Sequence, residues 1–127
     1  QRCYATMCYF GEGGSEDLVE ARNYFEKAAA DKENSDAQYN YATMCYNGQG
    51  GIKYLEKARE NFKELAKQAY LDSQYQYATM CYFGQGGDED LVKACEYFKK
   101  AADQGDFRSL LRYNLTRLRL NFSIYIF

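Results

Sequence analysis

The feature that most constrains the fold of this chain is a hexapeptide, Tyr-Ala-Thr-Met-Cys-Tyr, that occurs three times. It stands at residues 4–9, 41–46 and 77–82, so successive copies begin 37 and 36 residues apart. A glycine loop follows each copy at the same distance, with these first glycines: Gly11, Gly48 and Gly84. An alanine, a phenylalanine and a second alanine then recur at fixed distances: Ala21, Phe25, Ala29; Ala58, Phe62, Ala66; Ala94, Phe98, Ala102. Features kept in register over three copies predict a repeat protein.

The spacing inside each copy is helical. In the middle copy the residues at i, i+3, i+4 and i+7 form one face: Tyr41, Met44, Cys45 and Gly48. This predicts a helix over about 36–47, capped by Ser35 or Asp36 and ended by Gly48, a residue suited to the left-handed conformation. The aromatic positions Tyr41 and Tyr77 are predicted core, together with the three repeated phenylalanines.

A second helix is predicted after the glycine loop, over about 53–69. Its apolar stripe consists of the following residues: Leu55, Ala58, Phe62, Leu65, Ala66 and Ala69. A pair of short antiparallel helices cannot bury its apolar faces alone, so the copies must stack. The predicted fold is therefore all-α, an α-solenoid of antiparallel helix pairs with about three repeats of 36–37 residues.

The repeats divide the chain into four segments. The first repeat covers 1–34, with its first helix truncated, the second covers 35–71 and the third covers 72–105. Residues 106–127 form a degenerate segment, expected to hold a capping helix and an apolar tail.

This pattern resembles the Sel-1-like repeat family, relatives of the tetratricopeptide repeats with a slightly longer unit. The resemblance rests on alanines, glycines and Lys-Ala pairs: Ala37, Ala42, Gly48, Gly50, Lys57-Ala58, Lys93-Ala94, Lys27-Ala28-Ala29, Lys100-Ala101-Ala102 and Gly105. The chain departs from the family pattern where Tyr41 and Tyr77 replace leucine, Cys45 and Cys81 replace tyrosine, and Gly51 and Gly87 replace valine. The resemblance implies an adaptor that scaffolds complexes in signalling or protein quality control.

Catalytic chemistry finds little support in the composition. The chain has no histidine, the commonest catalytic base and metal ligand, and none of its serines begins an S-x-x-K motif. The glycine loops follow helices and do not continue into G-K-[ST], so they are interpreted as helix caps and not as phosphate sites. We expect no enzyme activity, no catalytic residues, no cofactor, no metal and no small-molecule substrate.

The five cysteines are interpreted as reduced thiols. Cys8, Cys45 and Cys81 recur at one repeat position, where helix spacing keeps them too far apart for a disulfide, and paired C-x₂-C zinc spacing is absent. A reducing compartment such as the cytoplasm is therefore favoured. Some secreted members of the resembled family link each repeat by a cysteine pair, and here Cys81 and Cys95 offer both partners.

The charge distribution and the hydropathy of the chain limit the kinds of partner that we expect. Residues 1–107 carry 12 basic and 18 acidic side chains, and residues 108–127 carry four arginines and no acid. An acidic body repels phosphate, so no nucleic-acid partner is expected. No stretch reaches the roughly 20 apolar residues of a membrane helix. Gln1 is neither a methionine start nor part of a signal peptide, which suggests a fragment of a longer repeat protein or a processed chain.

One face of the first helix varies between copies while the core positions stay constant. Its residues are these: Cys3, Thr6 and Phe10; Asn40, Thr43 and Asn47; Gln76, Thr79 and Phe83. A surface adapted to a partner would vary in this way, and so would a solvated face under neutral drift. If the face is functional, Phe10 and Phe83 are the expected anchors, since aromatic side chains often dominate interface energies.

The last twenty residues allow two interpretations. One is a helix over about 106–117 that caps the open end of the third repeat. The other is a divergent end with an exposed apolar strand, since Leu118, Leu120, Phe122, Ile124 and Ile126 alternate.

The sequence predicts a protein-interaction scaffold or adaptor that binds a partner segment along the solenoid groove. The alternative is a secreted bacterial effector or envelope protein of the same fold.

Overall fold

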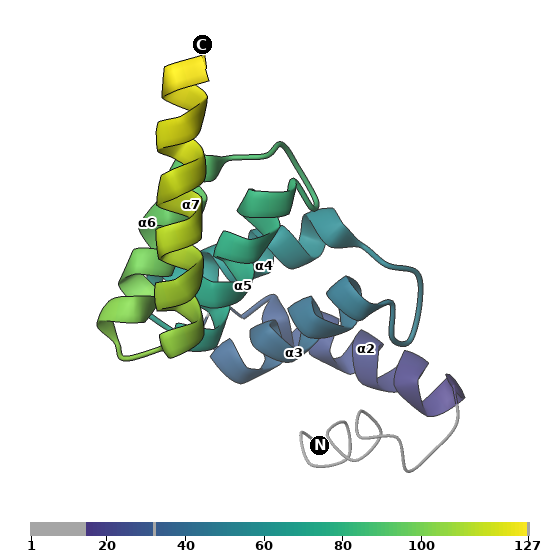
Figure 1. Ribbon diagram of the computed structural model, residues 1–127. Helices are drawn as coiled ribbons and strands as arrows, with labels where there is room; N and C mark the ends of the chain where they lie inside the picture. The colour runs from purple at the N-terminus through teal and green to yellow at the C-terminus, as the bar shows by residue number, and fades with distance from the viewer. Residues whose placement is uncertain (1–14, 32, 127) are drawn as a thin grey trace. The chain divides into compact units, whose positions relative to one another are not determined.

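Every regular element that the structure describes is an α-helix (Figure 1). The computed structural model describes residues 15–31 and 33–126. Its helices are α2 (Ser15–Ala29), α3 (Ser35–Asn47), α4 (Leu55–Lys67), α5 (Leu71–Phe83), α6 (Leu91–Asp103) and α7 (Phe107–Ile126). The predicted all-α class is confirmed.

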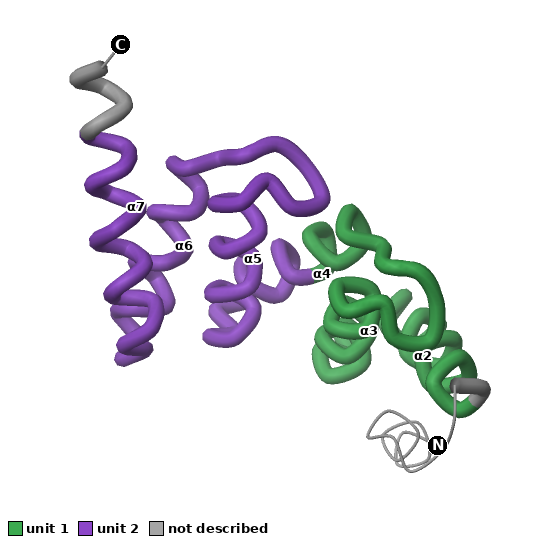
Figure 2. Tube along the Cα trace, turned by 45° about the vertical axis from the view of Figure 1, so that its right-hand side comes forward, with its two compact units in different colours: residues 1–61 green, residues 62–127 purple. Residues whose placement is uncertain are grey.

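The chain divides into two compact units, residues 1–61 and 62–127, and the division falls within α4 (Figure 2). In the first unit α2 packs against α3. In the second unit α6 packs against both α5 and α7. Each unit thus contains parts of more than one sequence repeat.

The helix α3 confirms the predicted helix over 36–47 but begins differently. Its N-cap is Asn34, whose side-chain oxygen accepts a hydrogen bond from the backbone N–H of Ala37 at 3.2 Å. The predicted caps Ser35 and Asp36 are wrong, because Ser35 already lies in the first turn and the Asn34 carboxamide reaches the free N–H. Gly48 ends the helix as predicted, with a φ of 75° and its N–H bonded to the Met44 carbonyl.

The repeated positions form the core of both units. The three phenylalanines Phe25, Phe62 and Phe98 are buried, as are the aligned residues of α3 and α5: Tyr41, Met44 and Cys45; Tyr77, Met80 and Cys81. The repeated alanines Ala58 and Ala94 are also fully buried, which lets neighbouring helices approach closely. The core predicted from the spacing is confirmed at these positions.

The end of α4 corrects the predicted apolar stripe. The helix ends at Lys67, and Ala69 is exposed with a φ of 71°. Its N–H bonds the Ala66 carbonyl at 3.0 Å, and the Tyr70 N–H bonds that of Leu65 at 3.3 Å, an arrangement that closes helices through a left-handed residue. The prediction that Ala69 belongs to the helix is wrong; it followed from the high helix propensity of alanine. The third repeat has Gly105 at this position, a residue that adopts positive φ without strain.

The C-terminal segment agrees with the prediction of a helix and not with the prediction of a strand. Residues 107–126 form the continuous helix α7, so the predicted apolar strand is wrong. A helix satisfies its backbone hydrogen bonds within the segment, whereas a lone strand would leave them without protein partners. Leu120 occupies the repeat position at which Gly84 ends α5, so no glycine stops α7 there.

Three of the four arginines of α7 lie over aromatic rings of α5. The Arg108 guanidinium is 4.3 Å from the Tyr75 ring centre, and that of Arg119 is 5.1 Å from the Tyr82 ring. A planar guanidinium stacks on a ring better than an ammonium does, which explains the change from lysine to arginine in this segment.

α7 also exposes a row of apolar residues along its length: Phe107, Leu111, Leu115 and Leu118. That α7 caps the array therefore stays a prediction. Within residues 15–31 and 33–126, no helix combines the length and the apolar character that crossing a membrane requires.

Candidate functional site

The predicted partner-binding residues of α3 lie outside its buried face. Asn40 and Thr43 are half-buried and Asn47 is exposed. The Thr43 hydroxyl donates a hydrogen bond to the Tyr39 carbonyl one turn earlier, at 2.9 Å. This bond uses the hydroxyl hydrogen and leaves the methyl group and both lone pairs of the hydroxyl oxygen for outside contacts.

The corresponding residues of α5 have the same arrangement. Gln76 and Thr79 are half-buried, and the Thr79 hydroxyl donates to the Tyr75 carbonyl at 2.8 Å. Phe83 is 55% exposed at the end of the helix. The structure thus brings the three predicted residues of each helix to one side of that helix. Thr6 and Phe10, with Cys3 beside them in the same set, lie outside the described residues.

Phe83 is exposed but has a defined setting. Its ring meets the Tyr82 ring edge to face at 4.9 Å, and the Arg112 guanidinium of α7 lies 5.9 Å from its centre. A large apolar ring held between an aromatic and a cationic neighbour loses little freedom when it binds, which suits an interface anchor.

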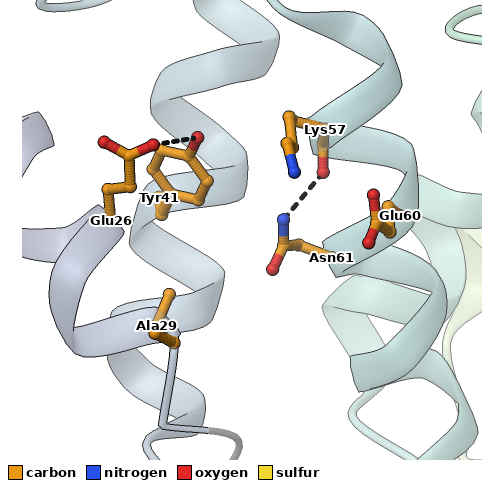
Figure 3. Close-up of a pocket in the computed structure, with 7 residues that line it drawn as sticks. Glu26, Ala29, Tyr41, Lys57, Glu60 and Asn61 are labelled. Atoms are coloured by element: carbon orange, nitrogen blue, oxygen red, sulfur yellow. Dashed lines mark hydrogen bonds between the residues drawn. The ribbon is translucent and has the colours of Figure 1, made fainter.

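A pocket of about 190 Å³ opens in the first unit beside Tyr41 (Figure 3). Three helices supply its walls: α2 with Glu26 and Ala29, α3 with Tyr41, and α4 with Lys57, Glu60 and Asn61. Ala30, which directly follows α2, completes the lining. The repeat spacing predicts Tyr41 only as a core residue and does not indicate a pocket beside it.

Tyr41 contributes a neutral phenol to this pocket. Its side chain is 6% exposed, and its hydroxyl donates a hydrogen bond to Glu26 Oε2 at 3.3 Å. Burial raises the pKa of Tyr41 well above its ordinary value, and the neighbouring Cys45 and Glu26 raise it further. The hydroxyl therefore keeps its proton throughout the physiological pH range and acts as a donor to the carboxylate.

The α4 wall is polar. Asn61 donates from Nδ2 to the Lys57 carbonyl at 2.8 Å, which holds the carboxamide against its own helix (Figure 3). Lys57 is half-buried and Glu60 is exposed. The pocket thus combines an aromatic wall with one basic and two acidic side chains.

The matching place in the second unit is filled. Tyr97 occupies the repeat position of Asn61, and Tyr77 that of Tyr41. The two rings meet edge to face, 5.0 Å apart at 84°, and Tyr97 is only 4% exposed. The Lys100 ammonium lies 4.7 Å from the Tyr97 ring centre.

Arg22 is a structural residue that the sequence reasoning missed. Its side chain is 8% exposed, and its guanidinium donates to the Ile52 carbonyl at 2.7 Å and the Gln49 carbonyl at 3.3 Å. It also lies 3.6 Å from the Cys45 sulfur. The helix of one repeat thereby holds the glycine loop of the next. The sequence does contain an indication of this role, because an arginine, Arg59, also stands at this position in the second repeat.

The structure describes Cys45, Cys81 and Cys95, and among these three no disulfide is formed. Burial raises the pKa of Cys45, although Tyr41 and Arg22 oppose the shift. Burial also raises the pKa of Cys95, against the charge of Arg117. Both thiols are thus less reactive than an exposed cysteine. No group of three or more potential metal-ligating side chains occurs in the part of the chain that the structure describes.

Comparison with known proteins gives a family and a fold. The sequence pattern of the Sel1 repeat matches residues 4–32, 35–70 and 71–106. No curated protein matches the sequence at a significant level.

Three solved structures are similar over most of this chain. A protective antigen of uropathogenic Escherichia coli strains, with an SLR fold, has a TM-score of 0.80 and 26% identity over 94% of this chain and 26% of its own. A Sel1 repeat protein from Oxalobacter formigenes has a TM-score of 0.78 and 21% identity over 90% of this chain and 46% of its own. Cysteine rich protein B of Helicobacter pylori has a TM-score of 0.64 and 20% identity over 86% of this chain and 88% of its own.

This chain spans about a quarter and about half of the first two of these structures. The neighbours are helical-repeat proteins, in agreement with the helix pairs described above. The three matched segments together cover most of the sequence. The chain belongs to the Sel1 repeat family.

Proposed function

We propose that this chain is a protein-interaction scaffold that binds a partner segment, as part of a longer repeat protein. Support comes from the family, whose repeats commonly mediate contacts between proteins. The similar structures from Escherichia coli and Oxalobacter formigenes extend well beyond the length matched here, which fits a role within a larger array.

The proposed contact residues stand at one set of aligned positions in the three repeats: Thr6 and Phe10; Asn40, Thr43 and Asn47; Gln76, Thr79 and Phe83. On α3 and α5 the described members lie beside the buried stripe and not within it. They offer amides, hydroxyl groups and one aromatic ring, which together suit an extended polypeptide with both polar and apolar side chains.

The observation that carries the proposal is the exposure of Phe83. A phenylalanine that is 55% exposed keeps about half of its surface available for contact with a partner. Exposed aromatic residues are prominent among those that dominate interface energies.

Affinity capture with the full chain tests the proposal. Wild type, Phe83→Ser and Val92→Ser serve as baits, because Val92 is an apolar residue on α6 that is even more exposed than Phe83, at 66%. A protein retained by wild type and Val92→Ser but lost with Phe83→Ser supports the proposed surface. Equal retention by all three baits argues against it. A large fall in the melting temperature of Phe83→Ser would place the ring in the core instead.

A further inference from the structure

The second repeat lacks a ring that its neighbours possess. At the position thirteen residues after the first glycine of the loop, the repeats carry Tyr24, Asn61 and Tyr97. The repeated hexapeptide begins with a tyrosine in every copy, and this tyrosine is Tyr41 in the second repeat and Tyr77 in the third. The middle repeat alone therefore pairs its tyrosine with a short carboxamide.

The third repeat shows what fills this place when tyrosine is present. The Tyr97 ring meets the Tyr77 ring at 5.0 Å and is almost completely buried. An edge-to-face pair of this kind adds to the free energy gained from burial alone. The fold of the repeat thus contains a seat for a phenol ring between its two helices.

In the second repeat this seat is the pocket beside Tyr41. Asn61 and Tyr41 both line it, and its volume is about 190 Å³ (Figure 3). An apolar cavity of roughly 150 Å³ is large enough to bind benzene. The open space therefore has the size of one aromatic side chain, and it lies where the chain places such a side chain elsewhere.

We propose that the pocket beside Tyr41 binds a tyrosine side chain of a partner protein, with its ring edge to face against Tyr41 as Tyr97 is against Tyr77. This inference rests on the proposed scaffold function, since it names a side chain of the partner. It adds a contact with the partner to those proposed above for the exposed and half-buried residues of α3 and α5.

The charges around the pocket favour a phenol over a purely hydrocarbon ring. Glu26 and Glu60 are exposed carboxylates that can accept a hydrogen bond from the hydroxyl of the bound tyrosine. Lys57 also lines the pocket, and its ammonium can lie over the bound ring as that of Lys100 lies 4.7 Å from Tyr97. With two acids and one base at the rim, the pocket also suits a tyrosine that has a basic neighbour in the partner sequence.

The test uses p-cresol, which is the tyrosine side chain without its backbone, as the probe. The full chain is labelled with ¹⁵N and ¹³C, and its spectra are recorded as p-cresol is added. Saturable shifts centred on Tyr41, Ala29 and Asn61 are expected, with a Kd on the order of 1 mM for so small a ligand. No saturable shifts at these residues would overturn the proposal.

The key variant is Asn61→Tyr, which supplies the missing ring from the chain itself. It is expected to fold with an unchanged or higher melting temperature and to lose the p-cresol shifts at Tyr41. A variant that folds and still binds p-cresol as wild type does would overturn the proposal. The reciprocal variant Tyr97→Asn is expected to open a second site, with new p-cresol shifts at Tyr77; if it fails to fold, the Asn61→Tyr result alone decides.

A second probe, N-acetyl-tyrosinamide, distinguishes a protein partner from a free phenol. Binding of both probes supports a tyrosine carried on a polypeptide. Binding of p-cresol alone overturns the proposed partner and assigns the pocket to a free phenolic compound. Both titrations need no partner protein, so they can succeed or fail independently of the capture experiment with Phe83→Ser.

Discussion

Tyr41 and Tyr77 occupy the same position in two copies of the same hexapeptide, yet their surroundings differ. Both are buried on the inner face of a 13-residue helix. Tyr77 packs against the Tyr97 ring, whereas the Tyr41 hydroxyl bonds Glu26 beside an open pocket. The helix pattern decides that both tyrosines are buried, and one residue on the following helix decides whether the space beside them is closed.

The comparison shows that a repeat protein can vary its chemistry without varying its frame. The buried pair Ala58 and Phe62 recurs as Ala94 and Phe98, and the glycines of the loop recur as well, so the helix pairs can share one backbone. The positions between them are free to differ. The predictions below test first what the copies share and then where they differ.

The largest effect is expected at the shared phenylalanines. Phe25 and Phe98 are each buried in a different unit. Replacing either with alanine should lower the free energy of unfolding by about 3–5 kcal/mol, because the cavity left behind adds to the lost burial. Chemical denaturation of the two variants measures the losses. A loss below about 1 kcal/mol at one site only would show that the two cores are not equivalent.

Arg22 marks a difference between the copies. Replacing it with alanine should cost about 2–3 kcal/mol, because the buried guanidinium makes part-buried hydrogen bonds to the Gln49 and Ile52 carbonyls, which would lose a charged donor. Arg22→Lys should recover only part of this, since a single ammonium cannot replace a planar fork of donors.

The matched control for Arg22 is Cys95→Arg. Cys95 occupies the same position in the third repeat, and no glycine loop follows in α7 for an arginine to hold. Thermal unfolding should show no gain from this change, because Cys95 is half-buried and the charge of Arg117 lies near it. A clear stabilisation would mean that arginine acts here through something other than the loop of the next repeat.

Ala69 and Gly105 form a reciprocal pair. Both have positive φ, 71° and 96° respectively, and alanine is strained in that region whereas glycine is not. Ala69→Gly should therefore stabilise the chain, and Gly105→Ala should destabilise it, each by about 1 kcal/mol. No neighbouring atom lies within 4 Å of a Cβ built at Gly105, so the effect there isolates the backbone. Opposite signs in thermal melts are the expected result; equal signs would contradict the explanation.

The smallest effect concerns the residue before a helix. Asp106 precedes α7 and accepts hydrogen bonds from Ser109 and Arg108, whereas Tyr70 at the same repeat position gives α5 no side-chain cap. Partial desolvation raises the pKa of Asp106, but the bonds from Ser109 and Arg108 prevail and hold it below its ordinary value. Asp106→Asn should therefore cost about 1 kcal/mol or less at neutral pH.

The pH dependence gives the sign of this effect. The folded pKa is lower than the unfolded one, so the stabilisation is complete above the unfolded value of about 4 and is lost as the pH falls through the folded value. The difference in melting temperature between wild type and Asp106→Asn should shrink below pH 4. A difference that grows with acidity would contradict the assignment. Tyr70→Asp should add a cap to α5, with a gain of about 1 kcal/mol or less.

Local sequence signals predicted much of this molecule. The spacing of Tyr41, Met44 and Cys45 identified a buried helix face, and Gly48 marked where that helix ends. The errors arose where two residues compete for one role or where local pattern is ambiguous. Asn34 displaced Ser35 as the cap, and Ala69 adopted a conformation that alanine usually avoids.

Local sequence patterns predicted only part of the candidate sites. The exposed position of Phe83 follows from helix periodicity, because it lies on the side opposite the buried residues. The pocket beside Tyr41 does not, because it depends on how far a side chain of α4 reaches toward α3. Aligning Asn61 with Tyr24 and Tyr97 would have indicated a missing ring, but only the structure shows that the space stays open.

The sequence by itself determined the repeat, the helix pairs and the buried positions, since periodicity and glycine placement act within a few turns of one helix. Tertiary structure alone decided that Arg22 binds the loop of the next repeat, that α7 continues as a helix with arginines over the rings of α5, and that Asn61 leaves a pocket. These outcomes depend on distances between side chains far apart in the sequence. Packing sets those distances, and no local pattern encodes them.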